Sequence, residues 1–226
     1  MRKLLVALLL LLGPIAPALA QVSVAIGIPG ISIGINVPVY PRLVAVPGYP
    51  VYYAPGLRAN YFFYDGLYWV FGNGNWYLSS WYDGPWQRVA PDAVPGIILR
   101  VPVRYYRYPP PYFRAWAPSA PPRWGEHWGY AWEERHRGWD RPERRIAVAP
   151  APLPRYQRDY AGRRYPGAER QRALEAEHYR YRPRDPIVRQ HFEGRGGRGT
   201  PMAPREHRGP GPDHARGPER RGPDRD

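Results

Sequence analysis

The chain has 226 residues, a net charge of +14 and no cysteine, which excludes disulfides and thiolate chemistry. Its only lysine is Lys3, so lysine-dependent chemistry such as Schiff bases and P-loops is excluded from the rest of the chain. Residues 21–103 are nearly neutral, whereas residues 104–226 carry 27 arginines against 16 acidic residues. This asymmetry predicts a folded part followed by a basic region that attracts polyanions.

The first twenty residues, "MRKLLVALLLLLGPIAPALA", have the layout of a secretory signal peptide. Arg2 and Lys3 precede an apolar run, and Ala18 and Ala20 form a small-x-small cleavage site. The alternative is a retained membrane anchor, but two prolines leave the apolar helix well below the roughly 20 residues that a span needs. We therefore expect cleavage after Ala20 and an exported protein that is periplasmic, extracellular or associated with the outer membrane.

Residues 21–58 are expected to hold apolar strands and a proline-rich connection. The alternation in "VSVAIGIPGISIGINVPVY" predicts two strands around Pro29-Gly30. Five prolines follow between residues 38 and 58, which predict an extended, turn-rich segment.

Residues 59–106 are predicted to form an aromatic β-hairpin domain. Asp65-Gly66 and Asn73-Gly74 are strong signals for two-residue turns. With these turns, Tyr64 opposes Leu67 and Phe71 opposes Trp76. Because side chains alternate along a strand, one face becomes an apolar core and the other is rich in tyrosine. The core face holds Phe62, Tyr64, Leu67, Trp69, Phe71, Trp76 and Leu78; the other face holds Tyr61, Phe63, Tyr68, Val70, Tyr77 and Ser79.

A third hairpin is expected at Asp83-Gly84, since the Tyr-Asp-Gly of residues 64–66 recurs there. It would pair Trp81 with Trp86, and Leu78 with Val89. Pro85 limits the last strand to an edge or a bulge because proline donates no ladder hydrogen bond. One more strand is predicted over residues 97–101, after which the domain ends near residue 106.

Residues 107–193 read as a Pro/Trp/Arg-rich extension with one or two short helices. Trp124, Trp128 and Trp132 recur at the helical spacing of i, i+4 and i+8. "PGAERQRALEAEHYRYR" predicts a second short helix, and residues 194–226 are expected to be disordered. The predicted class is mainly β: a small antiparallel meander or barrel-like sheet, then this extension and a basic tail.

Candidate binding residues lie in two places. If the tyrosine-rich face is open, its rings and two tryptophans form a carbohydrate-binding platform of Tyr61, Tyr68, Tyr77, Trp81 and Trp86. The stripe of Trp124, Trp128 and Trp132 either docks on the sheet, lies at a membrane interface or contacts a partner.

Catalytic and metal sites have only weak support. Asp65 and Asp83 could form the carboxylate pair of a hydrolase, but aspartate is expected at turn positions in any case. His127 beside Glu126, or His136 near Glu133, could hold a metal weakly; such pairs are more typical of solvated helix faces. No catalytic or cofactor-binding motif occurs, so we expect no enzyme, cofactor or metal.

The hairpins together with "LRVPVRYYRYPPPYFRAW", "PPRWGEHWGYAWE" and "YRYRPRDPIVRQHF" resemble a group of uncharacterised exported proteins of Gram-negative bacteria. "GNWYLSSWYDGPW" is also similar to the Trp-x-x-Gly-x-Trp repeats of small envelope proteins. The resemblance implies export and a shared architecture. Together these features predict a non-catalytic envelope protein that contacts polyanions or polysaccharide, with peripheral membrane contact as an option and no nucleic-acid partner.

Overall fold

The structure, a computed structural model, describes residues 34–141 and 149–196. The predicted signal peptide, the turn at Pro29-Gly30 and residues 197–226 of the predicted tail lie outside these ranges. The end of the second predicted N-terminal strand, residues 34–37, lies inside them and does not join the sheet. Its Val37 N–H donates to the side chain of Asp83, not to a neighbouring strand.

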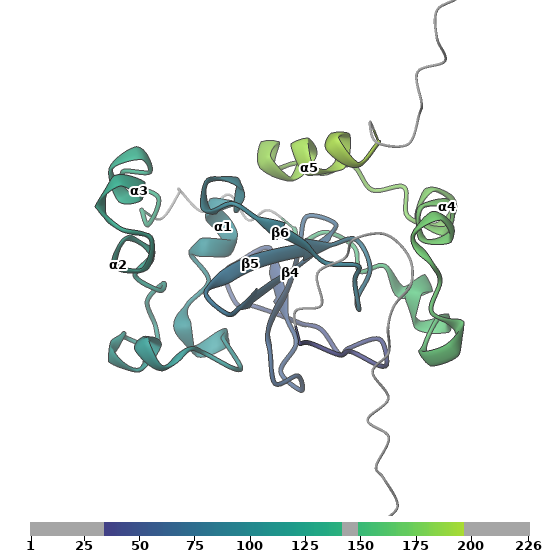
Figure 1. Ribbon diagram of the computed structural model, residues 1–226, viewed down its shortest axis with the longest axis horizontal. Coiled ribbons are helices and arrows are strands. Elements are labelled where there is room, and N and C mark those ends of the chain that lie inside the picture. Colours follow the sequence, from purple (N-terminus) through teal and green to yellow (C-terminus); the bar gives the residue numbers. More distant parts are fainter. Residues whose placement is uncertain (1–33, 142–148, 197–226) are drawn as a thin grey trace, which may run out of the picture.

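An antiparallel sheet of six strands occupies the centre of the described molecule, with its strands in sequence order (Figure 1). This order is the simplest meander, in which each strand pairs with the next through a short connection. The strands are β1 (Val44–Ala45), β2 (Val51–Tyr53), β3 (Asn60–Tyr64), β4 (Leu67–Gly72), β5 (Asn75–Ser79) and β6 (Gln87–Val89).

The two central hairpins have the predicted turns and register. Asp65, Gly66, Asn73 and Gly74 all have positive φ, between 50° and 94°, as a type I′ turn requires at both of its centres. Tyr64 pairs with Leu67, and Phe71 pairs with Trp76. The predicted division of the side chains between two faces is therefore confirmed.

The third hairpin corrects the prediction. Val89 lies opposite Trp76, two residues from the expected partner Leu78, and no strand pairing joins Trp81 to Trp86. Pro85 has no amide hydrogen to donate, so the strands separate before the turn and leave a wider loop. Because the shift is two residues, Val89 keeps its predicted face.

Two further segments differ from the sequence-based expectation. The proline-rich connection contains β1 and β2, joined by a turn in which Val46 N–H donates to the carbonyl of Val51 at 2.8 Å. Residues 97–101, expected as a strand, instead include the single-turn helix α1 (Gly96–Leu99). Pro95 precedes this turn, and its carbonyl accepts the N–H groups of Ile98 and Leu99, which bury their side chains in the core.

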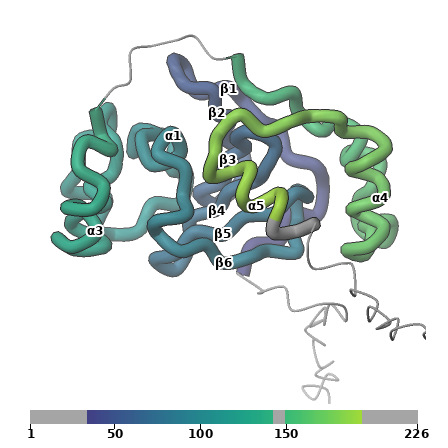
Figure 2. The backbone as a smooth tube through the Cα atoms, turned by 90° about the horizontal axis from the view of Figure 1, so that it is seen from above, coloured from purple at the N-terminus to yellow at the C-terminus, as the bar shows by residue number. Residues whose placement is uncertain are grey.

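The described residues contain more helix than strand, so the mainly-β prediction holds only for the antiparallel sheet itself. The tryptophan stripe forms α2 (Trp124–Trp128) and α3 (Tyr130–Arg135), separated at Gly129. The second predicted helix is α4 (Ala168–His178). An unpredicted helix, α5 (Pro186–Gly196), lies across the sheet in Figure 2. Short 3₁₀ turns occur at Pro91–Ala93, Val103–Tyr105, Pro111–Ala115, Arg155–Asp159 and Gly162–Arg164.

Both faces of the sheet are covered. The predicted core face packs with α1, α2, α3 and α5 in one apolar cluster that includes Trp124, Trp132 and Val188. The tyrosine-rich face packs against residues from two segments, 35–43 and 151–181. Residues of the predicted extension, 107–193, therefore pack in both clusters. The extension is not a separate segment that comes after a complete sheet domain.

Candidate functional site

The tyrosine-rich face is closed, which corrects the expectation of an open binding platform. The five candidate rings are between 0% and 6% exposed: Tyr61, Tyr68, Tyr77, Trp81 and Trp86. A ring that is already packed on both sides offers no surface on which a sugar could stack.

Two hydroxyl groups of this face form hydrogen bonds inside the fold. Tyr61 donates to the carbonyl of Tyr82 at 2.6 Å, and Tyr68 donates to Gln157 Oε1 at 2.9 Å. Burial raises the pKa of both hydroxyls well above the usual range. These tyrosines therefore stay neutral and act as internal hydrogen-bond donors.

The first Tyr-Asp-Gly turn connects the sheet to the C-terminal part of the chain. Asp65 is only 4% exposed. Its carboxylate accepts the backbone N–H groups of Arg184 and Asp185, each at 2.8 Å, and the hydroxyl of Tyr181 at 2.5 Å. Tyr64 donates in addition to the carboxylate of Asp185 at 3.1 Å. Hydrogen bonds to an ionised acceptor are stronger than neutral ones, so this turn anchors the start of α5.

The second Tyr-Asp-Gly turn makes an equivalent connection with other segments. Asp83 accepts the N–H of Val37 at 2.8 Å, and the hydroxyl of Tyr82 donates to the carbonyl of Tyr160. The carbonyl of Gly84 accepts the hydroxyl of Tyr165 at 2.6 Å and the amide of Gln171. Partial burial raises the pKa of Asp83, and the Val37 hydrogen bond opposes that rise. Both candidate carboxylates of the hydrolase hypothesis are thus bound to the backbone of covering segments.

The tryptophan stripe docks on the sheet, which decides between the three interpretations left open by the sequence. Trp124 and Trp132 are 0% and 2% exposed, and Trp124 donates to the carbonyl of Leu99 at 2.9 Å. Its ring packs edge-on against Phe71 at 5.0 Å. Neither buried ring is available to a membrane or a partner. Among the described helices, none combines the length and apolar character that a membrane span needs.

The histidine–glutamate pairs show structural contacts and no metal-binding arrangement. His127 Nε2 lies 3.0 Å from the carbonyl of Gly74, and His136 Nδ1 lies 2.9 Å from the carbonyl of Trp132. Glu126 accepts hydrogen bonds from Trp116 and Arg123. Within the described ranges, no three metal-ligating side chains gather at one place.

A groove of about 590 Å³ lies between the edge strand β6, the β4–β5 turn and α2. Two candidates from the sequence line it: Trp128 of the tryptophan stripe, and His127, which was considered as a weak metal ligand. The lining residues are Gly74, Asn75, Trp76, Arg88, Val89, Ala90, Pro91, His127 and Trp128. The groove thus combines an arginine from β6, an imidazole from α2 and two indoles, one from α2 and one from β5.

The sequence did not predict that Arg88 lies across the groove from α2. Nothing in the local pattern around Arg88 differs from an ordinary exposed strand residue. Only the packing of α2 against Phe71 and Trp76 brings His127 and Trp128 to the same edge of the sheet. The Asn73-Gly74 turn was the single available signal, since it places Asn75 at the start of β5.

The chain was compared with protein-family models, with curated proteins and with solved structures, and none of the three comparisons found a match.

Proposed function

We propose that the protein is an exported, non-catalytic binding protein of the cell envelope that holds polyanionic envelope components through an arginine-rich surface. The export part of this proposal rests on the signal-peptide pattern of residues 2–20. The binding part rests on how the arginines of the described residues are exposed and paired.

The main support for the binding part is a stretch of the chain that has exposed arginines and no acidic residue. Between residues 100 and 123 the chain has no aspartate or glutamate, and the side chains of Arg104, Arg107 and Arg114 are exposed. By contrast, Arg123, Arg135 and Arg137 each pair with a carboxylate, at 2.6–3.4 Å. The charges of Arg104, Arg107 and Arg114 therefore stay available to an external anion.

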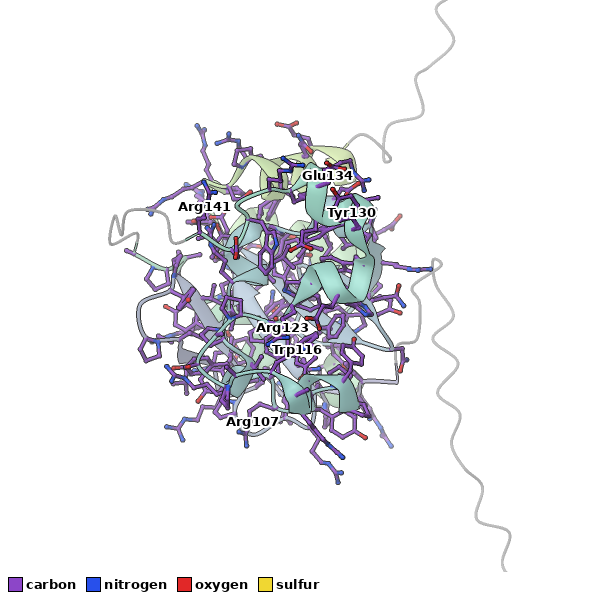
Figure 3. The ribbon with its side chains drawn as sticks, turned by 90° about the vertical axis from the view of Figure 1, so that its left-hand side faces the viewer. Arg107, Trp116, Arg123, Tyr130, Glu134 and Arg141 are labelled. Carbon is purple, nitrogen blue, oxygen red and sulfur yellow. The ribbon has the colours of Figure 1, made fainter. Side chains whose placement is uncertain are left out.

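Exposed tyrosines lie among these arginines. Tyr108 is 61% exposed and Tyr112 is 39% exposed, although large apolar rings are usually buried. Arg58 lies over the ring of Tyr108 at 5.9 Å, and Arg104 lies over Tyr105 at 5.1 Å. We call Arg58, Arg104, Arg107, Tyr108, Tyr112 and Arg114 the cationic face. Figure 3 shows the side of the molecule on which Arg107 and Arg123 lie.

This arrangement suits a flexible acidic polymer better than a compact ligand. Guanidinium groups pair with carboxylate or phosphate in two parallel hydrogen bonds, and aromatic rings add contact area that salt does not screen. The basic residues after residue 194 would add further charge to the same interaction.

A matched pair of triple variants tests the proposal. Arg104, Arg107 and Arg114 are changed together to glutamine in one protein; Arg123, Arg135 and Arg137 are changed in the other. Both lose three positive charges, but only the second set has carboxylate partners. We expect the first triple to weaken binding to polygalacturonate at least tenfold at low salt. The log–log slope of affinity against salt should fall by roughly 2.

Equal losses in the two triples would show that net charge alone drives binding, and salt-independent binding would contradict the proposal. A chain that ends at residue 196, measured in parallel, separates the contribution of the tail from that of the cationic face. Uncharged dextran serves as the control polymer. It should not bind to any of these proteins.

A further inference from the structure

We propose that the groove between β6 and α2 is a binding site for an acidic sugar unit, with the sugar ring on Trp128 and its carboxylate on Arg88. This inference rests on the proposed function, because it assigns one unit of the acidic polymer to a defined site. The groove is a different surface from the cationic face, and it has its own chemistry.

Arg88 supplies a positioned cation. It is exposed on the edge strand β6, in register with Tyr77 of β5. One terminal nitrogen, Nη2, donates to Asn75 Oδ1 at 2.6 Å, which holds the guanidinium against the sheet edge. Among the described residues, no carboxylate pairs with it. A guanidinium has five donors, so the remaining N–H groups can form a two-point contact with a carboxylate.

Trp128 supplies a rigid aromatic wall. Its ring stacks on Trp124 with centroids 4.7 Å apart and planes 18° apart, and it meets Trp132 edge-on at 4.7 Å. These contacts fix one side of the indole while the residue stays half-buried and lines the groove. A preformed apolar wall beside a few placed polar groups is the usual composition of a small-molecule site.

Trp76 is part of the groove lining and carries a buried, unsatisfied donor. Trp76 is 1% exposed and lines the groove, and its Nε1 is buried with no acceptor among the described residues. Buried indole N–H groups usually have a partner. Because this Nε1 is itself buried, Trp76 contributes an apolar part of the groove lining and does not bond a ligand directly.

His127 links the groove to the cationic face. Its ring lies parallel to that of Tyr112, with centroids 5.2 Å apart and planes 15° apart, while Nε2 contacts the carbonyl of Gly74 at the groove. Tyr112 belongs to the cationic face. A polymer with one unit in the groove can therefore continue over the imidazole and onto the arginines of residues 104–114.

The test uses trigalacturonate as the acidic ligand and maltotriose as the neutral one, added to the full chain labelled with ¹⁵N. Each of the nine tryptophans gives its own indole N–H signal. The signals of Trp76 and Trp128 can therefore be followed individually. We expect trigalacturonate to shift the signals of Trp76 and Trp128, and maltotriose to bind at least tenfold more weakly. Arg88→Gln should remove this preference, and Trp128→Ala should weaken both ligands at least tenfold.

The control variants are Arg42→Gln, an exposed arginine outside the groove, and Tyr130→Ala, an exposed ring that is 73% accessible. Neither should change the titration. Because Trp128 also packs in the core, Arg88→Gln is the deciding variant if Trp128→Ala does not fold. The proposal is overturned if the Trp76 and Trp128 signals do not move, or if Arg88→Gln binds trigalacturonate as tightly as the unaltered chain.

The two proposals fail in different ways. If Arg88→Gln loses trigalacturonate but keeps salt-sensitive binding to polygalacturonate, the groove assignment holds and the cationic face still binds the polymer without the groove. If polygalacturonate binding is insensitive to Arg104, Arg107 and Arg114 while the trisaccharide still binds in the groove, the proposed function fails and the groove assignment survives.

Discussion

Asp65 performs two tasks that use different parts of the residue. Its backbone has a φ of 50° in the hairpin turn, a conformation that aspartate tolerates better than most residues. Its carboxylate accepts three neighbouring donors from Tyr181, Arg184 and Asp185. Asp185 in turn accepts the N–H of Ile187 at 2.8 Å and so caps the first turn of α5. The turn and the start of the helix are thus joined by side-chain contacts.

Asp65→Asn should release this junction. One carboxylate oxygen would become an NH₂ group, and since the N–H of Arg184 contacts both oxygens, the new donor faces that N–H in either orientation. An unsatisfied buried donor costs about 1–3 kcal/mol. We expect hydrogen exchange to accelerate in residues 179–193 more than in β3 and β4. The control is Asn73→Asp, the reverse substitution at the same position of the other turn. Uniform acceleration throughout the sheet would contradict a local role.

Asp83→Asn should change how stability depends on pH. Burial raises the pKa of Asp83 in the folded protein, so between the unfolded and folded pKa values the folded chain binds more protons. Stability from this group is therefore lost as the pH rises through that window, starting from the unfolded value of about 3.9. Asparagine cannot ionise and still accepts the Val37 hydrogen bond.

The expected readout is the difference in melting temperature between Asp83→Asn and the unaltered chain. It should be near zero at about pH 3 and positive at pH 7. Asp140→Asn removes the same charge at an exposed position and reports the effect of net charge alone. A difference that does not vary with pH, or one of opposite sign, would refute the role of burial.

At the scale of elements, Gly129 decides the shape of the tryptophan region. The spacing of Trp124, Trp128 and Trp132 predicts one helix, but Gly129 has a φ of 87° and divides it in two. Its N–H donates to the carbonyl of Gly125 at 2.8 Å and ends α2. A residue with this conformation closes one helix and starts another in a new direction. This change of direction lets Trp132 reach the core while Trp128 stays at the groove.

Gly129→Ala should destabilise the protein by roughly 1–3 kcal/mol, because a φ of 87° with a ψ of 166° is a conformation that essentially only glycine adopts. A Cβ at this position would meet nothing within 4 Å, so the cost comes from the positive φ and not from a clash. Urea unfolding measures it, with Gly56→Ala as the control, since that glycine also has open space and no positive φ. An unchanged midpoint would mean that α2 and α3 can join into one helix.

At the scale of the whole molecule, the sheet separates two aromatic clusters. One contains Trp69 and Trp76, and the other contains Tyr61 and Tyr68. A sheet with one open face would expose its tyrosines, but here the segment of residues 151–181 covers them. In Figures 1 and 2 this segment and α4 lie on the side opposite α2 and α3. The long C-terminal half is therefore part of the fold.

Tyr68→Ala should consequently be about as damaging as Trp69→Ala, since both side chains are 0% exposed. Removing a large buried ring costs roughly 3–5 kcal/mol, a large part of the 5–15 kcal/mol that stabilises a typical domain. Denaturant midpoints of the two variants measure this. Tyr130→Ala, at an exposed position, should have almost no effect. A mild effect of Tyr68→Ala would show that the tyrosine-rich face opens in solution.

The sequence alone determined the central hairpins. Two consecutive residues with positive φ are rare outside Asx-Gly pairs, so Asp65-Gly66 and Asn73-Gly74 fix the turns, and the turns fix the register. The alternation of side chains then assigns each residue to a face. The helix at residues 168–178 was also predictable, because its composition is strongly helical over three turns.

Tertiary structure decided which segments cover the sheet. Residues 97–101 have strand-like composition, yet a helical turn forms after Pro95 and its Leu99 carbonyl accepts the indole N–H of Trp124. Strand propensity is weak against such packing. The strands β1 and β2 contain only two and three residues, too few for a pattern to reveal. The groove also depends on contacts between distant segments. Arg88, His127 and Trp128 meet because burying aromatic rings brings α2 to the sheet edge, and this driving force is non-directional, so sequence spacing does not record it.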